Sequence, residues 1–343
     1  GGDSDLVTMR SMDDVSLFGP MVYKLSQYEA NAAGITVPVK LVVMDAFEST
    51  RERLESADAS SQINDTNVMT RLKAFSVQAF QENFGLQKII SFSSTNARAH
   101  QISSAVSNLG SAGIECLVVS GKMSAAAREA ILRQCQRDTS QGPPLFISNA
   151  RVLMEGFDLP TCDGVFLADN MKSHVSIQQA MARAARCSPG KTCGYVCVPV
   201  EGSSLDGTSS AAYSNVKSVL LSMAEADELL LQDMRSWALS VGYNVNDRNV
   251  PLPGSLMERI VFPETIDYSK LVTGLEAVVL DMLGNWDQRF GMLTRYREEH
   301  GDCLVPYSYS TDDGVNLGAW VSTQRKIFKK GSLEADRVEK LTA

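Results

Sequence analysis

Between residues 88 and 200 the chain alternates short apolar runs with stretches of helical spacing, and this alternation constrains its fold more than any other feature. The apolar runs are LQKIISFSS, IECLVVSG, PLFISN, DGVFLAD and GYVCVPV. Helical patterns over residues 97–109, 125–136 and 176–186 lie between them. Apolar strands without polar alternation are buried on both faces, and helical connections are typical of a parallel sheet. The segment therefore predicts an α/β layer domain.

The flanking segments predict further divisions of the chain. Residues 1–47 hold two strand-like runs, 21–25 and 37–46, which are too few to close a domain and indicate the end of an earlier one. Residues 48–87 begin as a polar linker and continue as a helix with apolar residues at helical spacing. A Ser/Gly-rich break, EGSSLDGTSS, follows residue 200. Residues 201–284 then predict a helical connector, with one long helix over 216–239, and residues 285–343 predict a small all-helical module.

Composition excludes several classes of protein. With 343 residues and 44% hydrophobic side chains, the chain is long enough for about two globular domains. No apolar run approaches the roughly 18 residues of a membrane helix, and the first residues do not form a signal peptide, so we expect no membrane partner. Seven cysteines without a C-x-x-C pair predict reduced thiols inside the cell, in an unspecified compartment. Three separated histidines predict no metal site. The start without Met and the helical pattern at the end predict a piece of a longer polypeptide.

The charge is unevenly distributed. The chain carries a net −8, which disfavours nucleic-acid binding by bulk charge alone. Residues 88–200 nevertheless hold 11 Lys and Arg against 7 Asp and Glu, whereas both preceding and following segments are acidic. A basic segment suits a surface that contacts phosphates, and chance variation in surface charge is an equally good explanation.

Two groups of residues in the basic segment point to phosphate chemistry. Gly156 and Asp158 follow the strand PLFISN, and ligands bind in loops after parallel strands, although a turn glycine with a capping Asp would give the same pattern. Gln179, Arg183 and Arg186 are spaced i, i+4 and i+7, so they project from one helix face. Two arginines at this spacing can clamp a phosphoryl group, and the alternative is a solvated face with surface ion pairs.

Together these motifs resemble a known family. KIISFSST, ISNARVLMEGFDLP and QAMARAAR occur in the order of motifs IV, V and VI of the second RecA-like domain of superfamily-two helicases. The run Ser11–Ser26 is similar to the end of the first RecA-like domain in the branch related to type III restriction subunits. The block from residue 285 resembles the helicase-associated domain that follows such motors. The resemblance implies a RecA-like parallel sheet flanked by helices, followed by a small all-α module.

The resemblance also implies roles for individual residues. Arg183 and Arg186 would be the arginines that reach a triphosphate, and Gly156, Asp158 and Gln179 would lie beside the nucleotide. The positions implied to lie near a nucleic-acid backbone are Ser94, Thr95, Ser120, Gly121, Ser148 and Asn149. Short hydroxyls and exposed N–H groups suit phosphate contacts that do not distinguish bases. The implied partners are DNA or RNA and a first motor domain, and the implied cofactor is ATP with Mg²⁺.

Two departures from the family pattern bear on activity. Ala182 stands where motif VI has Gly, and no G-x-x-x-x-G-K-[ST] loop or D-E-x-H box occurs in the sequence. Without the loop lysine and the Mg²⁺-binding carboxylate, the chain alone cannot assemble a hydrolytic site. The sequence therefore leaves two functions open: the C-terminal part of an ATP-dependent helicase or translocase, or a non-catalytic module that binds nucleic acid or protein. A dinucleotide enzyme would need a Gly-rich loop, which is absent.

The last module offers a weaker indication. Trp286 and Trp320 could stack on bases, but their helical spacing predicts that they lie in the core. Arg325 and Lys326 are the better candidates for phosphate contact, although a basic helix end also complements the helix dipole. The sequence does not distinguish DNA from RNA, unwinding from translocation, or one oligomeric state from another.

Overall fold

A computed structural model of the chain describes residues 19–20, 25–45, 65–109, 113–139, 142–150, 153, 158–171, 173–200, 214–244, 250–262 and 268–342. Within these residues the strands are β1 Val39–Asp45, β2 Lys88–Phe92, β3 Glu115–Val119, β4 Leu145–Asn149, β5 Gly164–Leu167, β6 Gly194–Val200 and β7 Ile260–Val261. They form one sheet in the order β3-β4-β2-β5-β6-β1-β7, and every pairing is parallel. The predicted α/β sheet is confirmed.

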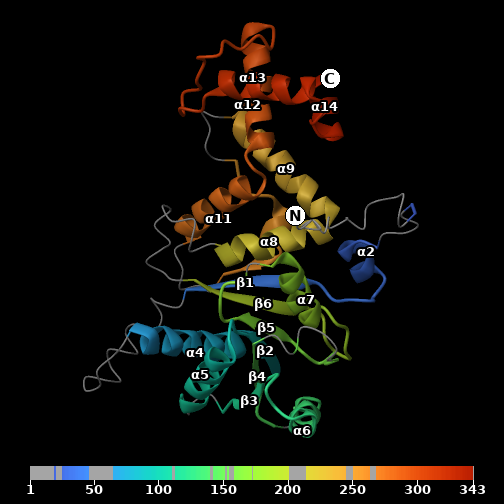
Figure 1. Ribbon diagram of the computed structural model, residues 1–343, viewed down its shortest axis with the longest axis vertical. Helices are drawn as coiled ribbons and strands as arrows, with labels where there is room; N and C mark the ends of the chain where they lie inside the picture. The colour runs from blue at the N-terminus through green and yellow to red at the C-terminus, as the bar shows by residue number, and fades with distance from the viewer. Residues whose placement is uncertain are drawn as a thin grey trace, which may run out of the picture.

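Helices cover both faces of this sheet. Among the described residues up to 200, the helices are α2 Gln27–Ala32, α4 Asp65–Phe84, α5 Asn96–Asn108, α6 Ala125–Cys135 and α7 His174–Ala184. Figure 1 shows α4 and α5 to one side of the sheet and α7 and α8 (Ser214–Ala226) to the other. Neighbouring strand residues bury opposite faces: Ile89 belongs to the core under α4 and α5, and Ile90 to the core under α7 and α8. Burial on both faces explains the unbroken apolar runs.

Three of these helices begin with a side-chain cap at the carboxyl edge of the sheet. Thr95, Ser124 and Ser173 each accept a hydrogen bond from the backbone N–H three residues later, at the starts of α5, α6 and α7. Each helix follows a strand, β2, β3 or β5. In a parallel sheet the ends of these strands lie at one edge, so the three helix N-termini lie there as well.

The connector differs from the prediction. The single helix expected over 216–239 is two helices, α8 and α9 (Glu228–Tyr243), separated by Asp227. The Asp227 carboxylate accepts from the N–H groups of Leu229 and Leu230 and pairs with Arg259 at 2.6 Å. A buried N-cap that also binds a cation favours a new helix start over continuation. Residues of both helices belong to the same buried cluster as residues of the sheet, so the connector shares the core of the α/β domain.

Segment 1–47 also packs differently from what we expected. Its strand β1 pairs along its whole length with β6, and β7 from the connector pairs with β1. The apolar strand is thereby buried within the sheet of residues 88–200. The strand expected at 21–25 lies almost entirely outside the described residues, as does the linker before residue 65. The proposed domain boundaries remain predictions.

The C-terminal module stands on the end of the long helix α9 (Figure 1). Its helices are α12 Trp286–His300, α13 Leu317–Lys329 and α14 Ala335–Thr342, preceded by α10 Gly254–Met257 and α11 Tyr268–Met282. Helices α9 and α12 cross at glycines: a Cβ on Gly242 would lie 1.7 Å from the Gln288 carbonyl oxygen, and one on Gly291 would lie 2.1 Å from that of Leu239. Trp286 and Trp320 are buried in the module's core, as their spacing predicts.

None of the described helices is both long enough and apolar enough to cross a membrane.

Candidate functional site

The carboxyl edge of the sheet gathers most of the positions expected to contact a nucleic-acid backbone. Ser94 and Thr95 follow β2, and Ser120 and Gly121 follow β3. Ser94, Thr95 and Gly121 are exposed, whereas Ser120 is buried and accepts from the N–H of Lys122. Because α5 and α6 begin beside them, this edge presents unbonded helix N–H groups together with hydroxyls. Such an edge can bind anions.

Two of the expected contact positions are buried instead. The Ser148 hydroxyl donates to the carbonyl of Ala99 at 2.9 Å. The Asn149 amide donates to the Ser91 carbonyl at 2.9 Å and accepts from the N–H of Leu153. Both side chains therefore hold the end of β4 and the loop after it, and neither is exposed to a ligand in this structure. Ser148 and Asn149 are the last two residues of β4, which is buried on both faces, and this explains the difference.

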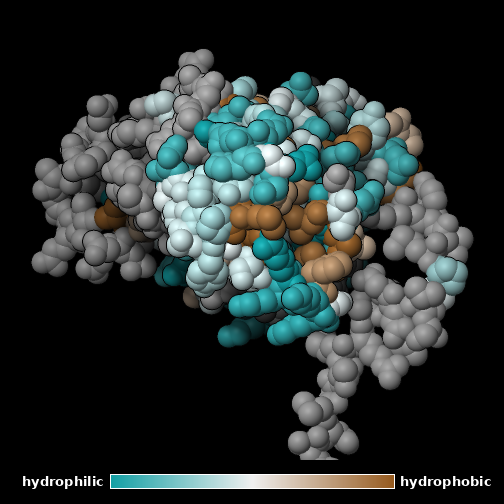
Figure 2. Space-filling view, turned by 90° about the horizontal axis from the view of Figure 1, so that it is seen from above, coloured by the Kyte–Doolittle hydropathy of each residue, from teal (hydrophilic) through white to brown (hydrophobic). Residues whose placement is uncertain are grey.

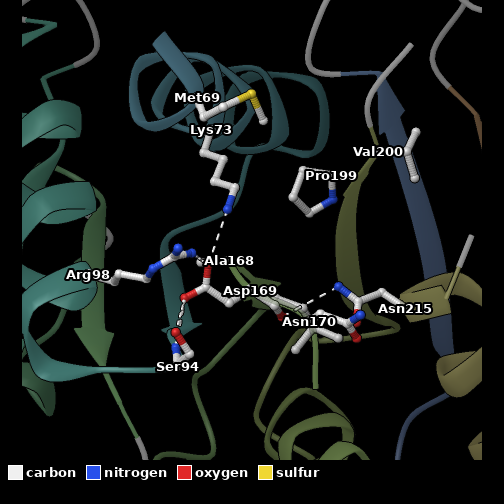
Figure 3. Close-up of a pocket in the computed structure, with 11 residues that line it drawn as sticks. Met69, Lys73, Ser94, Arg98, Ala168, Asp169, Asn170, Pro199, Val200 and Asn215 are labelled. Carbon is white, nitrogen blue, oxygen red and sulfur yellow. Dashed lines mark hydrogen bonds and ion pairs between the residues drawn. The ribbon is translucent and has the colours of Figure 1, made fainter. Parts of the chain in front are cut away.

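The centre of this edge is a carboxylate, Asp169, that the sequence analysis did not single out. Asp169 follows β5 and accepts from the Ser94 N–H and hydroxyl, both at 2.8 Å. Lys73 on α4 and Arg98 on α5 also reach it, at 3.2 and 2.6 Å. Figure 3 shows the side chains of Ser94, Lys73 and Arg98 pointing toward Asp169 from different elements. The carboxylate thus fixes two cations and the start of α5 beside a cavity of about 360 Å³.

The environment keeps Asp169 ionised. Its burial raises the pKa, but the Ser94 backbone N–H, Lys73, the Ser94 hydroxyl and Arg98 outweigh that effect and lower the pKa to about 2. Two cations against one anion leave a net positive charge at the cavity. The cavity also lies between the ends of β2 and β5, where the strand order reverses. The strand after β2 (β3) lies on one side of this point, and the strand after β5 (β6) lies on the other. Open α/β sheets bind ligands at such switch points.

The signal for Asp169 was present in the sequence. Asp169 is the last residue of the apolar run DGVFLAD and lies two residues beyond β5, as Ser94 lies two residues beyond β2. Lys73 gave no signal of its own, because it lies on the helix of a different segment and reaches the site only through the fold.

The arginines expected to reach a triphosphate lie at the opposite, amino edge. Helix α7 ends at Ala184, two residues before the end predicted from its spacing, so Arg183 lies in its last turn and Arg186 just beyond the cap residue Ala185. The helix ends there because the chain at Arg186 forms an antiparallel bridge with Thr36 and the Ala185 carbonyl accepts from the N–H of Val37.

The two arginines have different environments. Arg183 is only 6% exposed, and its burial, together with the charge of Arg186, lowers the pKa of its guanidinium. Arg186 is about one-third exposed and forms an ion pair with Asp158, which is largely exposed. The structure therefore brings Arg183, Arg186 and Asp158 together. Gln179 lies one turn before Arg183 and is half-buried, and Gly156 lies outside the described residues.

The last pair of candidates, Arg325 and Lys326, lies on the C-terminal module. Both are exposed on α13, and Arg325 donates to the Cys303 carbonyl at 2.9 Å. Figure 2, viewed from the end of the molecule that carries this module, shows an apolar band among hydrophilic side chains. An apolar groove of about 250 Å³, lined by Phe328 and Leu341 among others, lies next to Arg325. The module is thus amphipathic on its surface.

The donor set at the amino edge fits phosphoryl oxygens but not a metal. The guanidiniums of Arg183, in the last turn of α7, and of Arg186, just beyond the helix, match the oxygens of a phosphate chain. Among the described residues, however, no group of three His, Cys, Asp or Glu side chains could hold a metal ion. If ATP binds here with Mg²⁺, the metal ligands must come from elsewhere.

Comparison with known proteins agrees with the fold. The family of helicase conserved C-terminal domains matches residues 72–188, and the family of helicase associated domains matches residues 284–343. No curated protein matches the chain.

Among solved structures, the ATP-dependent Type ISP restriction-modification enzyme LlaBIII bound to DNA is 20% identical, with a TM-score of 0.56 over 84% of this chain and 20% of that one. A fragment of a putative HsdR subunit of a type I restriction enzyme from Vibrio vulnificus YJ016 is 19% identical, with a TM-score of 0.42 over 60% and 41%. The second likeness is too loose to compare site by site. The chain thus spans about one-fifth of the length of the first enzyme, and at this identity the likeness shows the fold.

These matches agree with the parallel sheet and the helical module that the structure contains. The chain therefore carries the conserved C-terminal, RecA-like domain of helicases, followed by a helicase associated domain.

Proposed function

We propose that the chain is the C-terminal part of an ATP-dependent nucleic-acid helicase or translocase. The observation that carries this proposal is the separation of two charged sites on one sheet. Arg183 and Arg186 lie at the amino edge, and the cationic cavity around Asp169 lies at the carboxyl edge. A motor needs one site for the nucleotide and another for the strand, coupled through a rigid body.

At the amino edge, Arg186 would contact the terminal phosphates of ATP, with the buried Arg183 beside it. Arginines supplied across an interface stabilise the charge that develops during phosphoryl transfer. The phosphate loop and the Mg²⁺ ligands would come from a first motor domain, in the same longer polypeptide. Asp158 would release Arg186 when the phosphates arrive, because an exposed ion pair of this kind contributes at most about 1 kcal/mol.

An exposed apolar surface beside Arg186 is consistent with the docking of a first motor domain there. Residues 26–37, which include α2, expose the large apolar side chains of Tyr28 and Ile35 to 55% and 58%. Ile35 adjoins Thr36, whose backbone pairs with that of Arg186. An apolar surface next to paired arginines suits a protein partner better than a nucleic-acid strand.

At the carboxyl edge, the strand of DNA or RNA would bind by its phosphates. Thr95 and Ser124 cap helices whose N-termini face this edge, and Arg98 and Lys73 add positive charge. These groups favour backbone contact without base specificity. Arg325 and Lys326 of the helicase associated domain would extend the same contact.

The nucleotide site is tested by replacing Arg186 with Ala in the complete natural polypeptide. We expect the nucleic-acid-stimulated ATPase rate to fall about 1,000-fold, as for other arginines that act in trans. Arg133→Ala is the matched control, because Arg133 is exposed and, among the described residues, pairs with Glu129 on its own helix α6. An unchanged rate for Arg186→Ala would contradict the proposal.

The nucleic-acid site is tested on the 343-residue chain by titrating fluorescent single- and double-stranded DNA and RNA at several salt concentrations. We expect affinity to fall with salt, and Arg98→Gln to reduce the slope by about one phosphate contact. Salt-dependent binding by a complete polypeptide that has no phosphate loop would favour the alternative, a non-catalytic binding module. A slope near zero for the wild-type chain would exclude a phosphate contact at this edge.

A further inference from the structure

Contacts from outside α7 reach the backbone at Arg186. Helix α7 ends at Ala184, and the N–H of its cap residue Ala185 donates to the Met181 carbonyl. The Arg186 carbonyl accepts from the Lys191 ammonium at 2.9 Å, and the Arg186 backbone forms an antiparallel bridge with Thr36, 150 residues earlier in the chain. The Cys187 thiol also donates to the Gly34 carbonyl at 3.2 Å.

Thr36 is itself held by a closed set of side-chain hydrogen bonds. Its hydroxyl donates to the Asn31 amide oxygen at 2.7 Å and accepts from the Gln27 amide at 2.9 Å. Gln27 also donates to the same oxygen of Asn31, at 3.0 Å. Each of the three side chains therefore contacts the other two, which fixes residue 36 relative to α2. A capping box at Ser26 and Glu29 fixes the start of that helix.

The other side of Arg186 is fixed independently. The Lys191 ammonium donates to the carbonyls of both Arg186 and Cys162, so it joins the arginine to the loop before β5 that carries Asp158. Burial lowers the pKa of Lys191, which shows how closely this ammonium is enclosed. On its other side, the Arg186 backbone is held by the bridge to Thr36.

From these contacts we infer that Thr36, held by Gln27 and Asn31, is a positioning residue for Arg186. This inference rests on the proposed function, because it assumes that Arg186 contacts a nucleotide. Phosphoryl transfer depends on geometry, and a displacement of about 1 Å can reduce a rate about 100-fold. Residues 26–37 would therefore set the rate of the chemical step without touching ATP.

The test uses Thr36→Val, which keeps the side-chain shape and removes both hydrogen bonds. In the complete polypeptide we expect kcat of the ATPase to fall about tenfold or more while KM for ATP stays within about twofold, because binding depends on other groups. Thr36→Ser keeps the hydroxyl and should restore kcat. Thr294→Val is the matched control, because this half-buried threonine donates its hydroxyl to the Phe290 carbonyl within its own helix α12. If Thr36→Val does not fold, Gln27→Met removes one side of the set.

Hydrogen exchange on the 343-residue chain gives a second readout. The Val37 amide, which donates to the Ala185 carbonyl at 2.8 Å, should exchange about fivefold faster in Thr36→Val than in the wild type or in Thr294→Val. The possible failures are distinct. If Arg186→Ala is inactive but Thr36→Val retains its kcat, the positioning role is overturned and the proposed function stands. If Arg186→Ala retains full activity, both are overturned.

Discussion

Replacing Asp169 with Asn tests the electrostatics of the carboxyl edge. The cluster lowers the Asp169 pKa from its ordinary value of 3.8 to about 2. At ~1.36 kcal/mol per pH unit, ionised Asp169 contributes ~2.4 kcal/mol to the free energy of unfolding at neutral pH. The side chain is only 9% exposed, so solvent screening removes little of this. Asn cannot carry the charge that Lys73 and Arg98 require.

The sign follows from the direction of the shift. Because the folded pKa is lower than the unfolded one, the contribution is present above pH 3.8 and is lost as the pH falls toward 2. We therefore expect urea denaturation to show a loss of ~2 kcal/mol in Asp169→Asn at pH 7, nearly the same loss at pH 4, and about half of it at pH 3.

The matched control is Asp281→Asn, which removes an exposed ion pair with Lys217 and should cost less than about 1 kcal/mol. The reasoning is refuted if Asp169→Asn is as stable as the wild type at pH 7, or if its loss of stability is as large at pH 3 as at pH 7.

Two further predictions concern the packing of the connector. Gly242→Ala should lower the free energy of unfolding by about 1–3 kcal/mol or more, because its Cβ would overlap the Gln288 carbonyl. Gly254→Ala is the control, since open space surrounds Gly254 and the change should be neutral or slightly stabilising. Equal effects of the two changes on thermal or urea unfolding would contradict the close helix crossing. Asp227→Ala should lower the free energy of unfolding by about 3 kcal/mol, since it removes a helix cap and leaves Arg259 unpaired. Asp227→Asn keeps a capping oxygen and should lose less stability. Equal losses for the two variants in urea denaturation would show that the cap contributes nothing.

The sequence predicted the sheet because its signals are local. Apolar runs such as KIISF are buried on both faces wherever they pair, so their pattern does not depend on which strand lies beside them. The order of the strands and the place of β1 depend on contacts between distant segments, and no local pattern encodes them. The same holds for the break at Asp227, where the apolar spacing continues through a residue whose partner, Arg259, is 32 residues away.

The candidate sites divide in the same way. Arg183 and Arg186 could be predicted because arginines suit phosphate and lie three residues apart, and Asp158 because it lies in a loop after a strand. Their contact with a nucleotide stays a prediction. Ser148 and Asn149 were expected near a ligand from the resemblance to motif V, but their side chains complete the hydrogen bonding of the interior, which residue type alone does not reveal. The contacts of Lys73 with Asp169 required the fold.

The sheet contains strands from beyond the span that defines the helicase C-terminal family. That span ends at residue 188, before β6 begins, and β1 and β7 lie outside it on either side. A recombinant piece trimmed to residues 72–188 would leave the outer backbone groups of β5 unsatisfied beside fully apolar side chains such as Phe166. Exposed apolar strand edges pair with the strands of other chains, so such a piece should precipitate. A soluble recombinant protein should therefore include residues 39–45 and 260–261.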